Sequence, residues 1–287
     1  MLRHGFYKDR PALILERGDR SACFLPEDGG KLVSLRVGAR EFLAQRQGEH
    51  YRRLLPDTSY VEAECSAFDD MFPTIDPCEI GGKRYLDHGE VSRLSWGALI
   101  DGEALTLTCH LRELDAVFCK TARLEADGTL TLVYRMTNNT AAPLPCLWAG
   151  HIMLAGEEGA WVESPYTQAD SITQCFGQPL SREVAHILPP IDATGEYKFY
   201  YDEPASPMQC CVCYPSGGRV RFTFEGDAVR YLALWFNPGK LNGMYNLAVE
   251  PCTAPYDDPL RADAAGKGFV LPPCGSVAFT LRILAEE

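Results

Sequence analysis

Short segments in which apolar and polar residues alternate run through most of this chain, and they constrain its fold more than any other feature. Alternation with a period of two is typical of a β-strand that buries one face. Glycine, asparagine and aspartate clusters that favour tight turns separate the segments. The predicted strands are residues 13–15, 21–25, 31–37, 105–111, 130–137, 220–224, 231–236, 245–249 and 277–284.

Helical periodicity is scarce, and the best helix candidate is the short stretch 59–70. Many strands without helices between them predict an all-β sandwich or barrel and not a β-α-β fold. A proline-containing, loop-rich region at 164–207 resembles a domain boundary, but long loops are often surface excursions of one domain. Because candidate site residues lie on both sides of it, we predict a single domain over residues 1–287.

Composition and charge limit the class of protein. Hydrophobic residues make up 46% and charged residues 23% of the 287, as in ordinary globular domains. The formal net charge of −12 disfavours nucleic acid and anionic membranes as partners. No apolar run approaches the roughly 20 residues that span a bilayer. The N-terminus shows no apolar signal-peptide region, so we expect a cytoplasmic protein with its 12 cysteines reduced.

Two side chains that transfer protons near neutral pH follow apolar strand-like runs. His151 ends one such run, and alternation places it on one face with Ala149 and Met153. A histidine on such a face is more often structural than catalytic. Glu250 ends another run, and Pro251 favours an extended backbone there. Together the two residues form a candidate acid–base pair.

Other side chains could form the walls of a small-molecule pocket, although each is equally compatible with core packing or a solvated loop. Flat aromatic surfaces stack on the apolar faces of sugars, and polar groups can bind hydroxyls. A C-x-x-C spacing at 210–213 has no matching ligand pair, so we predict no metal site, and no phosphate-loop, dinucleotide or nucleophile-elbow motif is present. The pocket candidates are His88, Asp69, Arg93, Trp96, Trp148, Trp235 and Asn237.

The order of these motifs resembles the aldose 1-epimerase (galactose mutarotase-like) family. The similar segments are 25–35, 68–75, 87–89, 143–151 and 231–250, so the likeness spans nearly the whole chain. It implies a mainly antiparallel, galactose mutarotase-like β-supersandwich. By this resemblance His151 is the general acid, Glu250 is the general base, and His88 binds the substrate and polarises its ring oxygen. The chain departs from the family pattern in having a shorter glycine-rich stretch after His88.

The resemblance implies an aldose 1-epimerase that opens and recloses a free hexose by proton transfer, with no cofactor and a small-molecule sugar as partner. Two alternatives stay open. An epimerase of a phosphorylated or modified sugar would need a cationic cluster, from Arg36, Arg53 or Arg93. A non-catalytic carbohydrate-binding protein would need only the pocket walls. A homodimer is also left open.

The pH dependence can be anticipated from the acid–base pair. Mutual attraction should lower the pKa of Glu250 and raise that of His151, giving a bell-shaped activity profile across neutral pH.

Overall fold

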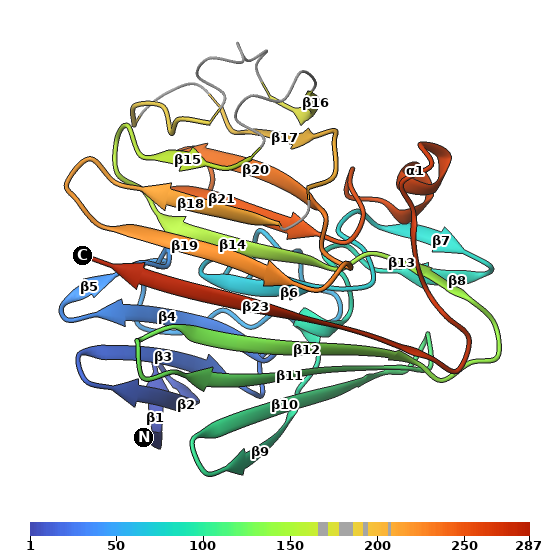
Figure 1. Ribbon diagram of the computed structural model, residues 1–287, viewed down its shortest axis with the longest axis horizontal. Helices are drawn as coiled ribbons and strands as arrows, with labels where there is room; N and C mark the ends of the chain where they lie inside the picture. Colours follow the sequence, from blue (N-terminus) through green and yellow to red (C-terminus); the bar gives the residue numbers. More distant parts are fainter. Residues whose placement is uncertain (166–171, 178–185, 192–194, 206–207) are drawn as a thin grey trace.

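Two large antiparallel sheets stacked face to face dominate the structure, a computed structural model (Figure 1). It describes the chain except residues 166–171, 178–185, 192–194 and 206–207. The larger sheet runs in the order β1 (Leu2–Tyr7), β2 (Arg10–Arg17), β3 (Arg20–Leu25), β4 (Lys31–Val37), β6 (Phe68–Met71), β14 (Ala149–Ala155), β21 (Tyr245–Cys252), β20 (Tyr231–Pro238), β17 (Tyr197–Tyr201) and β16 (Ile172–Phe176), with β5 (Arg40–Glu41) paired to β4.

The second sheet covers one face of the first. Its order is β15 (Trp161–Glu163), β18 (Gln209–Cys213), β19 (Arg219–Glu225), β23 (Ser276–Glu286), β12 (Leu130–Asn138), β11 (Ala116–Leu124), β10 (Ala104–Leu111) and β9 (Gly97–Asp101). The remaining elements are two small two-stranded sheets, β7 (Cys78–Ile80) with β8 (Lys83–Tyr85) and β13 (Leu144–Cys146) with β22 (Phe269–Leu271), a 3₁₀ helix η1 (Val91–Arg93) and α1 (Pro259–Ala264).

The all-β prediction is confirmed, and every predicted strand is present. The helix predicted at 59–70 is wrong: residues 68–71 form β6, and turns and irregular backbone precede it. All four residues of β6 are buried, so the segment lacks the polar, solvent-facing positions that reveal a strand. The region interpreted as loops, 164–207, contributes strands β16 and β17.

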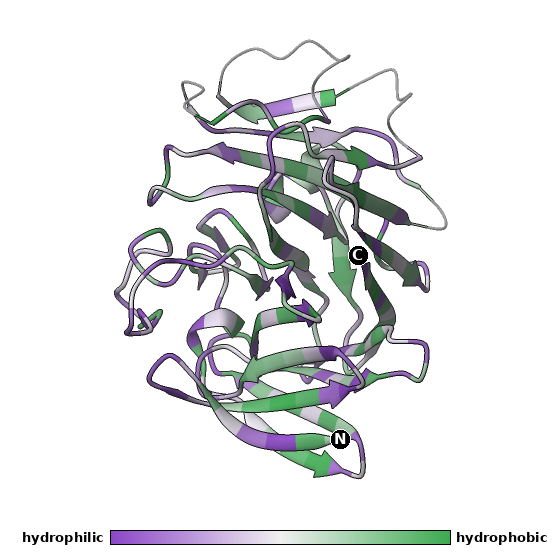
Figure 2. Cartoon of the chain, turned by 90° about the vertical axis from the view of Figure 1, so that its left-hand side faces the viewer, coloured by the Kyte–Doolittle hydropathy of each residue, from purple (hydrophilic) through white to green (hydrophobic). Residues whose placement is uncertain are grey.

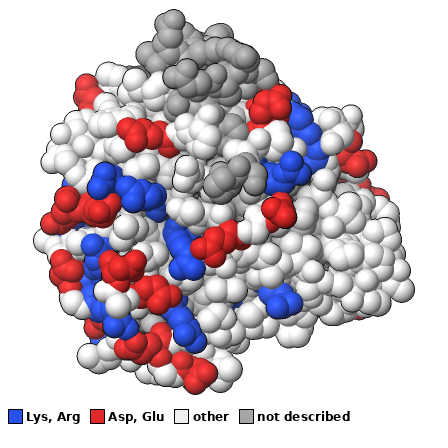
Figure 3. Space-filling view, in the orientation of Figure 1, with Lys and Arg blue, Asp and Glu red and all other residues white. Residues whose placement is uncertain are grey.

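The main hydrophobic core lies between the two sheets, and hydrophobic residues follow the central strands (Figure 2). Strands of the second sheet alternate because their outer face is in solvent, as in β12 and β23. On that outer face, acidic and basic side chains are interleaved (Figure 3), with ion pairs such as Arg219–Glu286. In contrast, β14, β20 and β21 are buried along nearly their whole length. Loops and α1 cover their second face, where the candidate site lies.

One buried ion pair lies inside the main core. Lys120 donates from Nζ to Asp70 Oδ2 at 2.7 Å, and both side chains are at most 1% exposed. Trp148 donates from its indole Nε1 to Asp70 Oδ1 at 3.0 Å and packs against Phe279. Trp148 is therefore a core residue, and the structure does not support the sugar contact predicted for it. Trp96 is likewise 3% exposed, with its indole nitrogen bonded to the carbonyl of Val91.

Replacing Lys120 with Met should lower the free energy of unfolding by about 3–5 kcal/mol, because Asp70 would remain as a buried charge without a counter-charge. Urea denaturation measures this change. Arg219→Met is the control: its pair with Glu286 is about half exposed, so the cost should stay within about 1 kcal/mol. Equal costs for the two variants would contradict the role given to the buried pair.

Candidate active site

The register of the larger sheet brings the predicted acid–base pair together. On β14 and β21, Ala149 pairs with Cys252 and Ile152 with Val249, which places His151 opposite Glu250. Side chains directly across a ladder point to the same face of the sheet. On one side of this pair, His151 is opposite Asp69 on β6. On the other side, Glu250 is opposite Ala233 on β20, which is opposite Tyr200 on β17. In the next row on the same face, Trp235 on β20 is opposite Lys198 on β17.

These rows form the floor of a cavity of about 220 Å³. That volume is below the roughly 300–1,000 Å³ of pockets for drug-sized ligands, and it suits one small molecule such as a monosaccharide. Of the predicted site residues, His88, His151, Trp235 and Glu250 line it. The remaining lining residues are Tyr60, Val61, Cys65, Ile75, Asp76, Phe176, Glu196, Lys198, Leu241 and Asp257.

Glu250 is fully buried, and its two carboxylate oxygens differ in their surroundings. Oε2 accepts a hydrogen bond from Lys198 Nζ at 2.6 Å. Oε1 has no hydrogen-bond partner among the residues that the structure describes, and it lies 3.7 Å from His151 Nε2. Buried polar atoms are nearly always satisfied, so an unpaired oxygen on a cavity wall points to a ligand that supplies the missing donor.

Lys198 is shared between two buried carboxylates. Besides Glu250, its Nζ donates to Asp257 Oδ1 at 2.7 Å, and the Tyr200 hydroxyl donates to the same oxygen at 2.6 Å. Lys198, Tyr200 and Asp257 are at most 5% exposed. The pKa of Lys198 is raised because attraction to Asp257 and Glu250 outweighs burial. The site therefore contains a permanent ammonium beside its candidate base.

The expected pKa shifts of the acid–base pair are wrong in direction. Burial lowers the pKa of His151 well below its ordinary value, and positive charge at His88, Lys198 and Lys31 adds to the effect. Burial raises the pKa of Glu250, and Lys198 opposes that rise. Desolvation of both groups outweighs their attraction across 3.7 Å. Burial therefore favours the neutral form of each group.

His88 reaches the cavity from a tight turn. Its ring stacks on Tyr60 with centroids 3.9 Å apart, and its Nδ1 lies 2.9 Å from the carboxylate of Asp87. Both His88 and Gly89 have positive φ, and a side chain at Gly89 would come within 2.4 Å of the Phe72 carbonyl oxygen. The His-Gly pair of the sequence thus holds an imidazole in place, 5.9 Å from the ring of His151.

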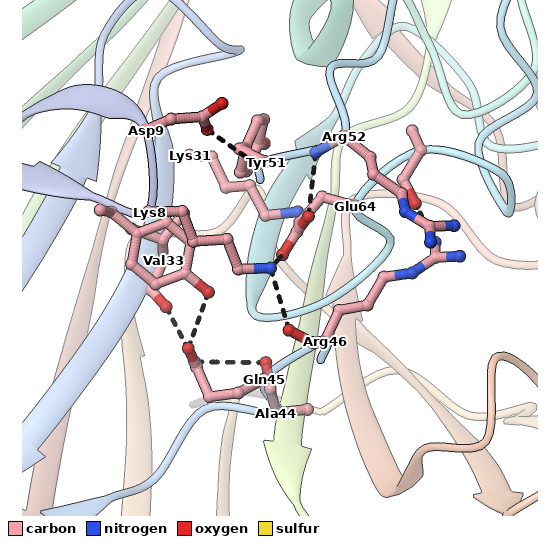
Figure 4. Close-up of polar contacts among 12 residues, drawn as sticks. Lys8, Asp9, Lys31, Val33, Ala44, Gln45, Arg46, Tyr51, Arg52 and Glu64 are labelled. Atoms are coloured by element: carbon pink, nitrogen blue, oxygen red, sulfur yellow. Dashed lines mark hydrogen bonds and ion pairs between the residues drawn. The ribbon is translucent and has the colours of Figure 1, made fainter. Parts of the chain in front are cut away.

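Segment 45–67 carries Tyr60 to the cavity, and polar contacts attach it to the larger sheet (Figure 4). Lys8 donates to the carboxylate of Glu64, and Gln45 donates to the carbonyl of Val33 at 2.9 Å. These contacts fix the segment on both sides of Tyr60.

Asp69 does not line the cavity but supports its wall. Its Oδ2 accepts hydrogen bonds from Lys31 at 2.6 Å and from the Tyr60 hydroxyl at 2.8 Å. Asn237 is also displaced from the cavity, since its side chain bonds both the amide and the carbonyl of Leu241. Asp69 bonds the lining residue Tyr60, and Asn237 bonds the lining residue Leu241. The structure therefore does not support the direct sugar contacts predicted for Asp69 and Asn237.

Arg36, Arg53 and Arg93 do not form the cationic cluster that a phosphorylated sugar would need. Arg93 donates to the carbonyls of Leu55, Thr58 and Asp87 and lines a different cavity, together with Arg84 and Arg112. Arg36 donates to the Ala39 carbonyl, and Arg53 bonds Asp28. None of Arg36, Arg53 and Arg93 lines the cavity of His151 and Glu250.

Sequence reasoning missed Lys198 and Asp257. Lys198 lies in the region interpreted as loops, where Tyr197–Tyr201 shows no alternation because all five residues are buried. Asp257 belongs to the pair Asp257-Asp258, and neighbouring carboxylates of this kind are usually solvated. In the structure Asp258 caps α1 by accepting from the Leu260 amide, whereas Asp257 has φ 65° and bonds Lys198.

Among the described residues, no group of three or more His, Cys, Asp or Glu side chains is arranged to hold a metal ion. Within the same residues, no helix is long and apolar enough to cross a membrane.

Solved structures with the same fold align over nearly this whole chain. The Slr1438 protein of Synechocystis sp. PCC 6803 matches with a TM-score of 0.73 at 16% identity, over 100% of this chain and 99% of that one. A galactose mutarotase-like protein of Clostridium acetobutylicum matches with a TM-score of 0.64 at 15% identity, over 100% and 98%. A proposed aldose 1-epimerase of Klebsiella pneumoniae matches with a TM-score of 0.75 at 15% identity, over 98% and 81%.

No protein-family model matches the chain, and no curated protein sequence matches it. Identities of 12–16% among the structural neighbours relate the fold and not the activity. The chain therefore has the galactose mutarotase-like fold, as its motifs predicted.

Proposed function

We propose that this protein is an aldose 1-epimerase that interconverts the α and β anomers of a free monosaccharide. The observation that carries the proposal is the pair of buried groups in one small cavity: Glu250 Oε1, which no described residue hydrogen-bonds, lies 3.7 Å from His151 Nε2. In a cyclic sugar the anomeric hydroxyl and the ring oxygen are bonded to the same carbon. A base and an acid acting on those two oxygens therefore belong side by side.

The reaction balances with these two groups alone. Glu250 Oε1 takes the proton of the C1 hydroxyl, His151 in its protonated form gives a proton to the ring oxygen, and the C1–O5 bond breaks to leave an aldehyde. Rotation about C1–C2 exposes the other face of the carbonyl. Reclosure returns both protons. Each positioned group contributes about 10²- to 10⁴-fold.

Other lining residues suit a sugar. Trp235 is 5.7 Å from His151 between ring centroids and offers a flat face for the C–H groups of a pyranose. His88, fixed by Tyr60 and Asp87, is placed to bind a hydroxyl or the ring oxygen.

The charge of the cavity argues for an unphosphorylated sugar. Among its described lining residues, four are carboxylates, Asp76, Glu196, Glu250 and Asp257, and Lys198 is the single lysine or arginine. Lys198 is already bonded to two of the four. A phosphate dianion would meet net repulsion there.

Polarimetry of freshly dissolved α-glucose and α-galactose tests the proposal. The protein should accelerate the approach to anomeric equilibrium, with α-glucose 6-phosphate a poorer substrate. Binding of these sugars without any acceleration would instead support a carbohydrate-binding protein on the same fold.

Activity should survive exhaustive treatment with EDTA, because the proposed reaction moves only protons between side chains and sugar. The rate is compared before and after chelation and after adding back Zn²⁺ or Mg²⁺. Loss of activity that one of these metals restores would contradict the mechanism.

A further inference from the structure

Lys198 bonds the candidate base, yet the reaction above assigns it no step. Its Nζ lies 2.6 Å from Glu250 Oε2 and 2.7 Å from Asp257 Oδ1, and the side chain is 5% exposed. Burying an ammonium is costly, and it is repaid only where the geometry and the partners are good. Here both partners are carboxylates that line the cavity.

The position of Lys198 separates the two oxygens of Glu250. Because Oε2 is bonded to the ammonium, Oε1 is the oxygen left to accept a proton from a ligand, and it faces His151. The ammonium thereby fixes the orientation of the carboxylate as well as its charge.

We propose that Lys198 is a positioning residue that keeps Glu250 ionised, so that Oε1 of Glu250 can act as the base. This inference rests on the proposed function, and it gives the reason why Glu250 can act as the base there.

The physical reason is the repulsion between the buried carboxylates of Glu250 and Asp257, which Lys198 offsets. Two buried carboxylates that share one ammonium cannot both stay ionised easily once that ammonium is removed. Lys198 also disfavours a positive His151, but it is bonded to Glu250 and not to His151, so its larger effect falls on the carboxylate.

Charged groups on several elements face Glu250. His151 lies on β14, Lys198 on β17, Asp257 just before α1, and His88 in the turn before η1. Lys31 on β4 and Asp69 on β6 pair with each other behind Tyr60, and Asp76 and Glu196 complete the acidic lining.

Lys198→Met removes the charge and retains the length of the side chain, whereas Lys198→Arg retains the charge. The direct readout is the ¹³C shift of the Glu250 carboxyl in glutamate-labelled protein, assigned with Glu250→Gln. We expect an ionised carboxyl at pH 7 in the wild type and in Lys198→Arg, and a protonated one in Lys198→Met. This readout does not require enzymatic activity.

Asp257→Asn should act in the opposite direction. It removes the competing carboxylate while leaving an oxygen for Lys198 and Tyr200, so Glu250 should ionise at lower pH than in the wild type. In kinetics, the pH of maximal kcat/KM should move up by at least one unit in Lys198→Met and down in Asp257→Asn. At pH 7, Lys198→Met should lose at least tenfold in kcat.

Lys120→Met is the matched control, because Lys120 is an equally buried lysine bonded to an aspartate outside the cavity. It should leave the Glu250 titration and the pH of maximal kcat/KM unchanged. Lys198 would be shown to be merely structural if Glu250 stayed ionised at pH 7 in Lys198→Met. If that variant does not fold, an unmoved Glu250 titration in Asp257→Asn overturns the proposal.

The two proposals fail separately. If the ¹³C shifts change as expected but the protein does not accelerate anomeric interconversion, the proposed function is wrong and the effect of Lys198 on Glu250 stands. If the protein is active but the Glu250 titration is unchanged in Lys198→Met and in Asp257→Asn, the proposed function stands and the role of Lys198 is wrong.

Discussion

Glu250→Gln should lower kcat by about 10²- to 10⁴-fold, with a smaller change in KM, because the amide keeps the shape of the side chain but cannot take the proton of the C1 hydroxyl. Steady-state polarimetry at several sugar concentrations separates kcat from KM. The loss should persist at every pH, since no ionisation restores a base at this position.

Glu41→Gln is the matched control for that variant. Glu41 is also a largely buried glutamate whose pKa is raised by burial, but it accepts from the amides of Leu35 and Leu43 and lies outside the cavity. Its kcat should stay close to that of the wild type. Similar losses in Glu41→Gln and Glu250→Gln would show a general effect of removing a buried charge and not catalysis.

His151→Asn should lower kcat by a similar factor of about 10²–10⁴ and remove one limb of the pH profile, because the amide cannot donate a proton to the ring oxygen. If both this variant and Glu250→Gln interconvert anomers at the wild-type rate, the two residues are structural. The site assignment would then fall, whatever the fold.

The same variant tests the pKa of His151 through stability. Burial lowers that pKa, so below about pH 6.5 the unfolded chain binds a proton that the folded protein refuses. The free energy of unfolding of the wild type therefore decreases by up to about 1.4 kcal/mol per pH unit as the pH falls from about 6.5 toward the pKa of His151 in the folded protein. Above pH 6.5 the group contributes no slope.

Burial raises the pKa of Glu250, so this residue changes the free energy of unfolding with pH in the opposite direction. The wild type and His151→Asn are therefore compared at each pH, because both contain Glu250. Urea denaturation from pH 5 to 8 should show the variant gaining stability relative to the wild type as the pH falls. A difference that stays constant with pH would mean that burial does not hold His151 neutral.

Strands with one face in solvent could be predicted from the sequence, since alternation records which side chains meet water. β12, β19 and β23 are such strands, and their predicted ranges agree with the structure. The order of His88, His151 and Glu250, together with the similar segments around them, also predicted the fold.

The sequence did not reveal β11 and β17, and each of these two strands contains a buried lysine. β11 alternates in burial, but Lys120 occupies an inward position, and β17 is buried throughout and carries Lys198. A lysine is buried only where a carboxylate meets it, and the partners here, Asp70 and Glu250, come from strands 50 and 52 residues away.

The sequence by itself therefore determined the all-β architecture and identified His151 and Glu250 as the candidate acid–base pair. Tertiary structure decided which carboxylates meet which ammonium groups, that Trp148 faces the core, and that burial reverses the expected pKa shifts of His151 and Glu250. The physical reason is that the pKa and the partner of an ionisable group depend on neighbours that only the folded sheet brings within hydrogen-bonding distance. Hydrophobic alternation, in contrast, can be read from adjacent residues.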